Sequence, residues 1–238
     1  MSIYRALSCG FGLSNKLKLA IFFTLIKALR PFGMPIPFSA RVSVGGGGGR
    51  TSKINFLGTI DEMLALGGIF VEEEYKPSIA PTSIADLGAN IGIASVWFAL
   101  RYPKAEITAY EANPDLIPNL RRNVEPLGVR VENKAVTHKN GPVTFFVMHR
   151  NFSSSLDQKG SSIPVTVQGI SLSDIRADFL KMDIEGAEFH AAHLARAKEI
   201  VGEMHGKSEA DIEKMRGELS RYACSFTKPK GTFRAILR

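Results

Sequence analysis

The alternation of apolar and polar positions predicts a layered α/β fold over the larger part of the chain. From about residue 84, short apolar runs such as "SIADLG", "EITAYE" and "DFLKMDI" are typical of buried strands. A helix-like stretch, "IASVWFALRY", lies between the first two runs and stops before Pro103. Strands that alternate with helices in this way predict a mostly parallel sheet with helices on both faces.

The other elements of this region continue the pattern. Asn113 and Pro114 open a second helix, and "VRVENKAV" predicts a third strand. An "NG" turn precedes "GPVTFFVM", which predicts an added strand. After "DFLKMDI" we expect a helix over "FHAAHLARA", a fifth strand at 199–205 and a helix that begins at Ser208. The last runs, "ACSFTK" and "TFRAILR", predict an antiparallel strand pair.

Two further strands, "RVSV" and "KINFLG", are joined by five glycines at 45–49 and "RTS". A Walker-type phosphate loop needs Gly, four residues and then Gly-Lys-Ser/Thr, whereas "VGGGGGRT" lacks the first Gly and has Arg for Lys. We therefore interpret the glycines as a flexible hairpin loop. The expected organisation is a basic helical extension at 1–40 and one domain at 41–238, divided into a hairpin cap at 41–83 and a core at 84–238.

The apolar run "LAIFFTLI" (19–26) indicates a helix rather than a membrane span. Its eight residues are far fewer than the roughly 20 needed to cross a bilayer, and "KALRPFG" offers no signal-peptide cleavage site. The spacing predicts an amphipathic helix ended by Pro31. Its predicted buried face consists of Leu17, Ile21, Leu25 and Ala28, with Phe22 and Ile26 beside them. This helix packs on the main domain or, alternatively, rests on an anionic membrane surface.

Positive charge is concentrated at the two ends of the chain. Residues 1–60 carry eight Lys or Arg and no acid, and the chain after Glu218 carries five more basic residues and again no acid. The stretch 61–218 therefore holds 17 basic and 23 acidic residues, although the whole chain has a net charge of +7. Basic ends of this kind indicate contact with an anionic acceptor or an anionic lipid surface or, alternatively, only pack on the domain and keep it in solution.

Overall composition is that of an ordinary globular protein, with 45% hydrophobic and 22% charged residues. The two cysteines, Cys9 and Cys224, are far apart and do not have a metal-binding spacing. We therefore expect neither a disulfide framework nor a zinc site, and a reducing, cytoplasmic location.

Ligands of parallel sheets bind beyond the carboxyl ends of the strands, so the residues there are informative. In "DLGANIG", Gly88 and Gly92 allow a sharp turn and a close approach to a ligand, before a helix whose amides point at it. Glu111, at the next strand end, is placed to accept both hydroxyls of a ribose. Nicotinamide-dependent enzymes use G-x-G-x-x-G, whereas this loop has Asn90 at the second glycine and Asp86 before the turn. It therefore favours a cationic or zwitterionic ligand over a pyrophosphate.

The stretch "KMDIEGAE" crowds three carboxylates after a strand, which costs stability unless a positive group offsets their repulsion. Asp183 and Glu185 are candidates for binding such a group and orienting a reacting hydroxyl. Lys181 forms an ion pair with them or is an exposed edge-strand lysine. Glu188, at a helix start, is interpreted as stabilising the helix dipole. His205, after the fifth strand, is a candidate base because its ordinary pKa is near neutrality.

Taken in order, several of these motifs resemble the FkbM family of S-adenosylmethionine-dependent methyltransferases, within the class I Rossmann-like group. The resemblance spans about residues 53–206. The motifs that carry it are "IFVEEEY", "DLGANIG", "YEANP", "NKAV", the serines at 153–155, "SLSDI", "FLKMDIEGAE" and "GEMHG". It implies a mostly parallel seven-stranded sheet with helices on both faces and an antiparallel C-terminal strand pair.

The resemblance also implies site roles and a reaction. Asp86, Gly88 and Asn90 are expected against the methionine part of S-adenosyl-L-methionine, Glu111 on the ribose and Asn133 near the adenine. The implied reaction is O-methylation of a sugar or another small-molecule hydroxyl. Nucleic acid is not expected as a partner, because the region around the predicted pocket is acidic and the sequence has no aromatic-rich basic stripe. The alternatives are a nucleic-acid methyltransferase or binding protein and an NAD(P)-dependent oxidoreductase.

Two catalytic arrangements remain open at the strand ends. In the first, Asp183 holds the acceptor hydroxyl near the methyl group, Glu185 assists and His205 accepts the proton. In the second, Asp183, Glu185 and Glu203 bind a divalent metal that acidifies the hydroxyl. The first is favoured, because Glu185 and Glu203 have other plausible functions at a helix start and in strand pairing.

Overall fold

The computed structural model describes residues 9–10, 12–29, 36–44, 49–147, 162–205, 208–227 and 231–238. The expected end of the first helix at Pro31, four of the five glycines and the serines at 153–155 lie outside these ranges. Within the described residues, no helix is both long and apolar enough to cross a membrane.

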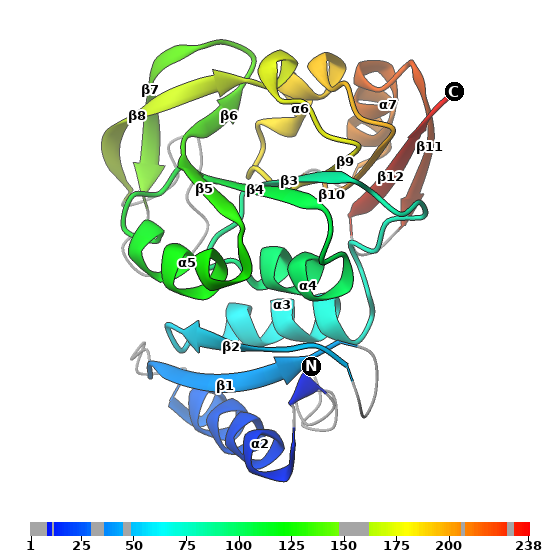
Figure 1. Cartoon of the computed structure of the whole chain (residues 1–238). Helices are drawn as coiled ribbons and strands as arrows, with labels where there is room; N and C mark the ends of the chain where they lie inside the picture. The colour runs from blue at the N-terminus through cyan, green and yellow to red at the C-terminus, as the bar shows by residue number, and fades with distance from the viewer. Residues whose placement is uncertain are drawn as a thin grey trace.

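The centre of the molecule is a seven-stranded sheet with the order β11-β12-β10-β9-β3-β4-β5 (Figure 1). Its strands are β3 (Ser83–Leu87), β4 (Glu106–Glu111), β5 (Arg130–Asn133), β9 (Phe179–Met182), β10 (Glu199–Glu203), β11 (Tyr222–Thr227) and β12 (Thr232–Leu237). The first five pair in parallel, and β12 runs antiparallel to β10 and β11. The predicted fold class is confirmed.

Helices cover both faces of this sheet. Figure 1 shows α4 (Ile93–Arg101) and α5 (Ile117–Val124) on one side, and α6 (Glu188–Ala191) and α7 (Glu209–Glu218) on the other. Neighbouring strand residues alternate between the two apolar cores, as the period of two requires. Phe179 packs with α4, for example, and Leu180 packs on the opposite side. Helix α7 begins at Ser208 as predicted, with a capping box between Ser208 and Asp211.

One predicted strand divides into two. The run "VRVENKAV" forms β5 in the central sheet and β6 (Ala135–Thr137) in a separate sheet of order β6-β8-β7. The chain turns between them, where the amide of Lys134 donates to the Glu132 carbonyl. The predicted strand after the "NG" turn is β7 (Gly141–Val147), whereas its partner β8 (Ile163–Ser171) was not expected from the sequence.

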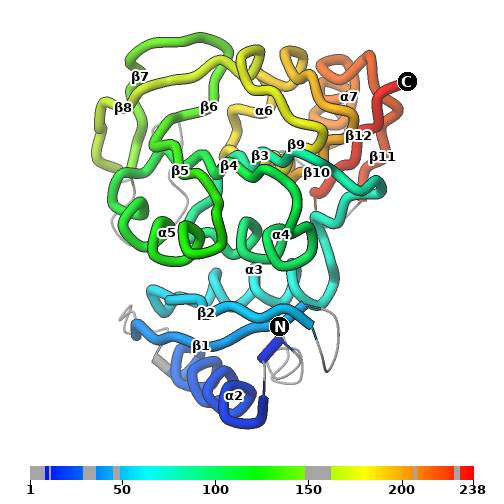
Figure 2. The backbone as a smooth tube through the Cα atoms, in the orientation of Figure 1, coloured from blue at the N-terminus to red at the C-terminus, as the bar shows by residue number. Residues whose placement is uncertain are grey.

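The N-terminal segment forms two layers below the core, and Figure 2 traces the backbone through them. Helix α2 (Gly12–Leu29) packs on an antiparallel hairpin of β1 (Phe38–Ser43) and β2 (Thr51–Phe56). Phe22 on α2 stacks on Phe38 of the hairpin, at 4.1 Å between ring centroids. A helix absent from the sequence prediction, α3 (Ile60–Phe70), packs against α4 and begins with a capping box between Thr59 and Glu62.

The predicted buried face of α2 is wrong. Leu17, Ile21 and Leu25 are 57%, 49% and 41% exposed. The residues that pack into the core are Leu19, Ala20 and Phe23, together with Ile26, which the prediction placed beside that face. The helix is apolar on both sides, so residue spacing alone does not determine which side faces the hairpin.

Candidate active site

The loop after β3 is held against the neighbouring strand β4. The amides of Gly88 and Ala89 both donate to the Tyr110 carbonyl, at 3.0 and 2.9 Å. Gly88 has a φ of 77°, in the left-handed region that glycine tolerates best. A Cβ at Gly88 would overlap the carbonyl oxygen of Asp183. The loop and the turn after β9 therefore touch, and only a glycine fits between them.

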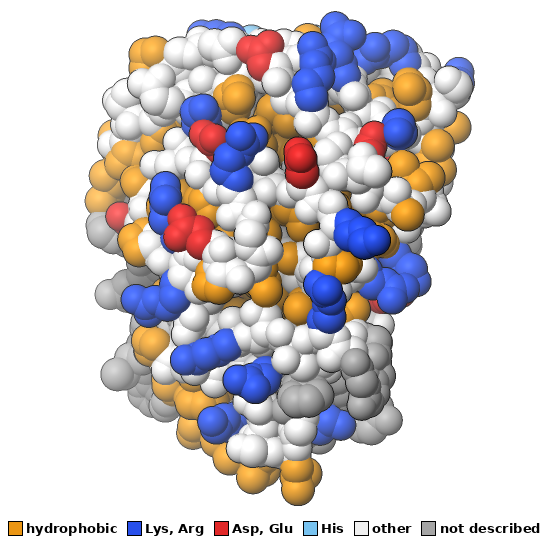
Figure 3. All heavy atoms as spheres, in the orientation of Figure 1, with side chains coloured by type: hydrophobic (Ala, Val, Ile, Leu, Met, Phe, Trp, Pro, Cys, Tyr) orange, Lys and Arg blue, Asp and Glu red, His pale blue; other side chains and the backbone are white. Residues whose placement is uncertain are grey.

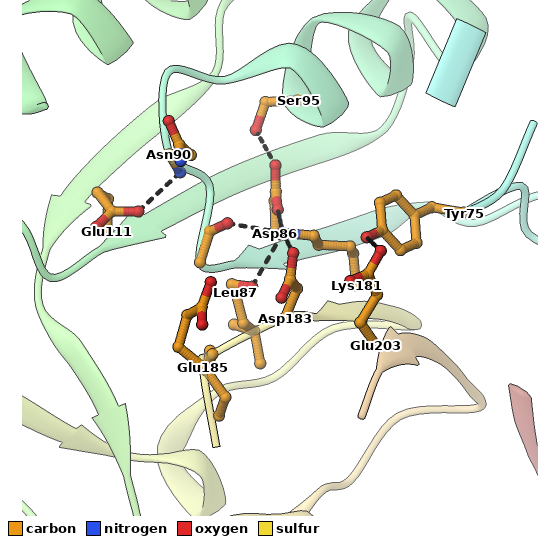
Figure 4. Close-up of polar contacts among 12 residues, drawn as sticks. Tyr75, Asp86, Leu87, Asn90, Ser95, Glu111, Lys181, Asp183, Glu185 and Glu203 are labelled. Carbon is orange, nitrogen blue, oxygen red and sulfur yellow. Dashed lines mark hydrogen bonds and ion pairs between the residues drawn. The ribbon is translucent and has the colours of Figure 1, made fainter. Parts of the chain in front are cut away.

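Glu111 ends β4 and closes this loop from the other side. Its carboxylate accepts hydrogen bonds from the amides of Asn90, at 2.7 Å, and Asn113, at 2.8 Å. The side chain is buried, and burial raises the pKa of Glu111 although the two amides oppose the shift. Figure 4 shows the carboxylate pointing at the loop. Glu111 thus positions the two segments that border the space beyond the strand ends.

Lys181 and Asp86 form a buried ion pair under the loop. Lys181 lies on β9 in the middle of the sheet, so its interpretation as an exposed edge lysine is wrong. Its Nζ is 3.2 Å from Asp86 Oδ1 and 3.7 Å from Asp183 Oδ2, and it donates to the Gly88 carbonyl at 2.7 Å. Asp86 also accepts from Ser95 Oγ on α4 (Figure 4). Burial would lower the pKa of Lys181, but Asp86 and Asp183 outweigh it and raise the pKa.

The three carboxylates of "KMDIEGAE" have different partners. Glu188 is fully buried and accepts from the amides of Ile184, at 2.8 Å, and Gly186, at 2.7 Å. It therefore closes the turn after β9, a role beyond the expected effect on the helix dipole. Glu185 lies in this turn and has a φ of 55°. This left-handed backbone conformation is strained for a residue that has a Cβ.

His205 lies among these carboxylates. Its Nδ1 is 3.2 Å from Glu188, and its Nε2 is 3.3 Å from Glu185 and 3.8 Å from Asp183. Burial would lower the pKa of His205, but the hydrogen bond to Glu188 and the other carboxylates raise it to about 9. The imidazole is therefore a cation at neutral pH, which offsets the repulsion between the carboxylates.

Glu203 and Tyr75 form a second polar pair beside Asp183. The Tyr75 hydroxyl donates to Glu203 at 3.2 Å, and Lys181 Nζ lies 5.5 Å from the centroid of the Tyr75 ring (Figure 4). Burial and the nearby charges of Asp183 and Glu74 raise the pKa of Glu203 to about 7. Tyr75 is missing from the predicted site, since its only signal was its place in the family motif.

Two adjoining cavities meet at the strand ends. The larger, of about 360 Å³, lies between the loop, α3 and the end of β10, and its wall includes Tyr75, Lys181 and Glu203. The smaller, of about 80 Å³, lies beyond β4. Its lining combines Glu111 and Asn113 with apolar side chains, among them Leu116, Val136, Phe145 and Ile184. Four residues line both cavities: Gly88, Asn90, Asp183 and Glu185.

Five of the predicted site residues thus line a cavity, and four do not. Those in the cavity walls are Gly88, Asn90, Glu111, Asp183 and Glu185. Outside both walls, Asp86 holds Lys181, and Gly92 packs its Cα side against Leu120 and Val124 of α5. The side-chain amide of Asn133 donates to the carbonyls of Glu111 and Ala112, and His205 contacts Glu185 at 3.3 Å. These four support the walls.

One group of residues has the composition of a metal site. A ligand atom from each of Asp183, Glu203 and His205 lies within 4.8 Å of the other two. The metal site predicted from the sequence had Glu185 as its third ligand, where this group has His205. Because the imidazole is a cation at neutral pH, this set would have to lose a proton before it bound a metal ion.

Comparison with known proteins gives a consistent family. Residues 86–223 match the family described as "Methyltransferase FkbM domain". The methyltransferase sdnD of Sordaria araneosa is 28% identical in an alignment that covers 50% of this chain and 63% of sdnD. The chain therefore spans less than two thirds of the length of this relative.

Solved structures that match this chain share little sequence with it. A methyltransferase FkbM from Methylobacillus flagellatus KT is 10% identical, with 98% of this chain and 57% of that chain covered and a TM-score of 0.48. A precorrin-6y C5,15-methyltransferase from Geobacter metallireducens GS-15 is 14% identical, with 74% and 87% covered and a TM-score of 0.41.

Proposed function

Because the chain belongs to the FkbM methyltransferase family, we propose that it binds S-adenosyl-L-methionine and methylates a hydroxyl of a small molecule or glycan. The observation that supports this most is the pair of adjoining cavities. Gly88, Asn90, Asp183 and Glu185 line both of them, so a group bound in one can react with a molecule bound in the other. The walls of the smaller cavity, which at about 80 Å³ holds only part of an adenosine, suit contacts with the ribose and one edge of the base, and the larger cavity suits the methionine part together with the acceptor.

The chemistry of the walls fits this cofactor. Glu111 offers a carboxylate for ribose hydroxyls, and the apolar side chains around it suit a flat base. The shared wall carries Asp183 and Glu185, which favour a positively charged ligand over a phosphate. The same charges favour a methyl acceptor other than nucleic acid, whose phosphates they would repel.

The expected roles in the transfer follow from which groups face the larger cavity. When bound, the cofactor supplies an activated methyl group. Asp183 orients the acceptor hydroxyl, and Glu203 takes its proton as the new C–O bond forms and the C–S bond breaks. Both carboxylates line the larger cavity, whereas His205 lies outside it and is already protonated at neutral pH. We therefore revise the expectation that His205 is the base and assign it the positioning of Asp183 and Glu185.

Cofactor binding is the first test. We expect calorimetry to show that the protein binds S-adenosylmethionine and S-adenosylhomocysteine and does not bind NAD. Glu111→Ala should weaken binding of both by about 1–3 kcal/mol, because the ribose hydroxyls lose their acceptor. Glu106→Ala is the matched control, since Glu106 is an exposed residue at the opposite end of the same strand. This variant should bind both ligands with the affinity of the wild type.

The possible outcomes test the contact between Glu111 and the ribose separately from the methyltransferase function. Equal affinity in wild type and Glu111→Ala would remove Glu111 from the ribose but leave the methyltransferase proposal standing. Failure to bind either ligand would refute the proposed function itself. An acceptor can then be sought by offering hydroxylated metabolites and glycans with radiolabelled cofactor.

Once an acceptor is known, the proton acceptor can be tested. We expect Glu203→Gln to lower turnover on the order of a hundredfold with cofactor affinity unchanged. Because the pKa of Glu203 is about 7, the wild-type rate should rise with a midpoint near pH 7 and level off at higher pH. Tyr75→Phe should keep the plateau and move the midpoint upward, since the hydroxyl that stabilises the Glu203 carboxylate is lost.

Two other results would change this assignment. A wild-type rate that rises until about pH 9, with a hundredfold loss in His205→Gln and none in Glu203→Gln, would make His205 the base. Turnover that EDTA abolishes and magnesium restores would assign Asp183, Glu203 and His205 to a metal ion.

A further inference from the structure

Helix α2 has an apolar face that the rest of the described chain leaves uncovered. The helix packs on the hairpin through Leu19 and its neighbours, yet its opposite side is also apolar. We name this side the apolar stripe; it consists of Leu13, Leu17, Ile21 and Leu25, which are 84%, 57%, 49% and 41% exposed. A spacing of four residues places these side chains in one row along the helix. Such a row in water is unfavourable unless something covers it.

Lysines border this stripe, and no acid accompanies them. At 3.6 residues per turn, Lys18 lies on one side of the stripe and Lys16 and Lys27 lie on the other. All three are exposed. The chain has no Asp or Glu before Asp61. Figure 3 shows hydrophobic side chains with Lys and Arg, and no Asp or Glu, at the lower end of the molecule, where Figure 1 places α2.

We propose that α2 docks the protein on an anionic lipid surface, with the apolar stripe inserted between headgroups and the lysines against lipid phosphates. An apolar face bordered by lysines on both sides is the arrangement that lies in the plane of a membrane interface. A nucleic acid would bind the lysines but leave the stripe exposed. A second copy would cover the stripe but bring lysines against lysines, with no carboxylate on this helix to pair with them. Of these three partners, an anionic lipid surface is the one that satisfies both features.

Vesicle sedimentation of the full chain tests this proposal. We expect binding to vesicles that contain phosphatidylserine, little binding to phosphatidylcholine alone, and a loss of binding as salt is raised. Lys18→Gln and Lys27→Gln should each weaken binding roughly fivefold, which corresponds to the attraction of one lysine to an anionic surface. Ile21→Ser should weaken it on the order of tenfold through the loss of inserted apolar area.

Matched variants separate this surface from general charge and hydrophobicity. Lys104→Gln removes an exposed lysine outside α2, and Leu237→Ser removes an apolar side chain that is 48% exposed, close to the 49% of Ile21. Both should bind vesicles like the wild type, and every variant should retain wild-type affinity for S-adenosylhomocysteine, which reports an intact fold. Equal binding to neutral and anionic vesicles, insensitivity to salt, or equal effects of Lys104→Gln and Lys18→Gln would refute the proposal. Self-association without lipid that Ile21→Ser abolishes would refute it in favour of a second copy.

Discussion

Replacing Gly88 with alanine is expected to lower the free energy of unfolding by about 2–5 kcal/mol and to abolish cofactor binding. A left-handed backbone costs a residue with a Cβ about 1–2 kcal/mol. The new methyl group would also overlap the Asp183 carbonyl oxygen, and overpacking costs about 1–3 kcal/mol or more where the neighbour cannot move aside. The carbonyl is a backbone atom in the turn after β9, so relief would require β3 and β9 to separate at their ends.

Gly128→Ala is the control for this prediction. Gly128 has a φ of 80°, against 77° for Gly88, but a Cβ there would meet no atom within 4 Å. Urea denaturation should therefore show a loss of only about 1–2 kcal/mol for Gly128→Ala, with cofactor affinity intact. Equal losses in the two variants would mean that the contact between the loop and Asp183 does not constrain the fold.

Lys181→Met is expected to destabilise the protein by about 3–5 kcal/mol, because it leaves Asp86 charged and buried without its partner. Combining it with Asp86→Asn should recover part of this loss, since no uncompensated charge then remains. The folded-state pKa of Lys181 is raised, so the ion pair contributes its full stability below the ordinary lysine pKa of about 10.4. That contribution is lost only as the pH rises through the higher folded-state value.

Lys198→Met provides the comparison for a lysine at the surface. Lys198 pairs with Asp178 at 2.8 Å, but its side chain is 68% exposed, whereas that of Lys181 is 4% exposed. Exposed pairs contribute at most about 1 kcal/mol, so this variant should unfold close to the wild type. A loss of similar size in Lys181→Met and Lys198→Met would refute the burial argument for Asp86 and Lys181.

Much of the fold could be predicted because local patterns agree with the tertiary structure. The run "EITAYE" is strand β4 over the predicted residues, and "IASVWFALRY" is α4 apart from its last residue. In each segment the apolar residues follow a single pattern, that of a strand in the first and of a helix in the second, and the helix ends before Pro103. The short α6 was expected to be longer, and α3 and β8 were not expected at all. The sequences of α3 and β8 contain Gly or Pro inside the element, which weakens the local pattern that packing later overrides.

The candidate site was predictable to the level of the strand ends. Parallel strands place their carboxyl ends at one edge of the sheet, so Gly88, Glu111 and Asp183 could be brought together from the order of the motifs. The protonation state of His205 could not be predicted from the sequence. Its pKa depends on Glu188 and Glu185, which lie 3.2 and 3.3 Å from the imidazole only in the folded chain. Tyr75 likewise reaches Glu203 across 128 positions of sequence.

The sequence by itself therefore determined the α/β class, the order of the core elements and the residue types at each strand end. These follow from periodicity and from turn chemistry, which act over a few neighbouring residues. Only the tertiary structure decided which apolar side of α2 faces the hairpin, that Lys181 is buried beside Asp86, and which strand-end residues face a cavity. Burial and electrostatic partners depend on segments far apart in the chain, and a local pattern carries no information about which distant segment will pack against it.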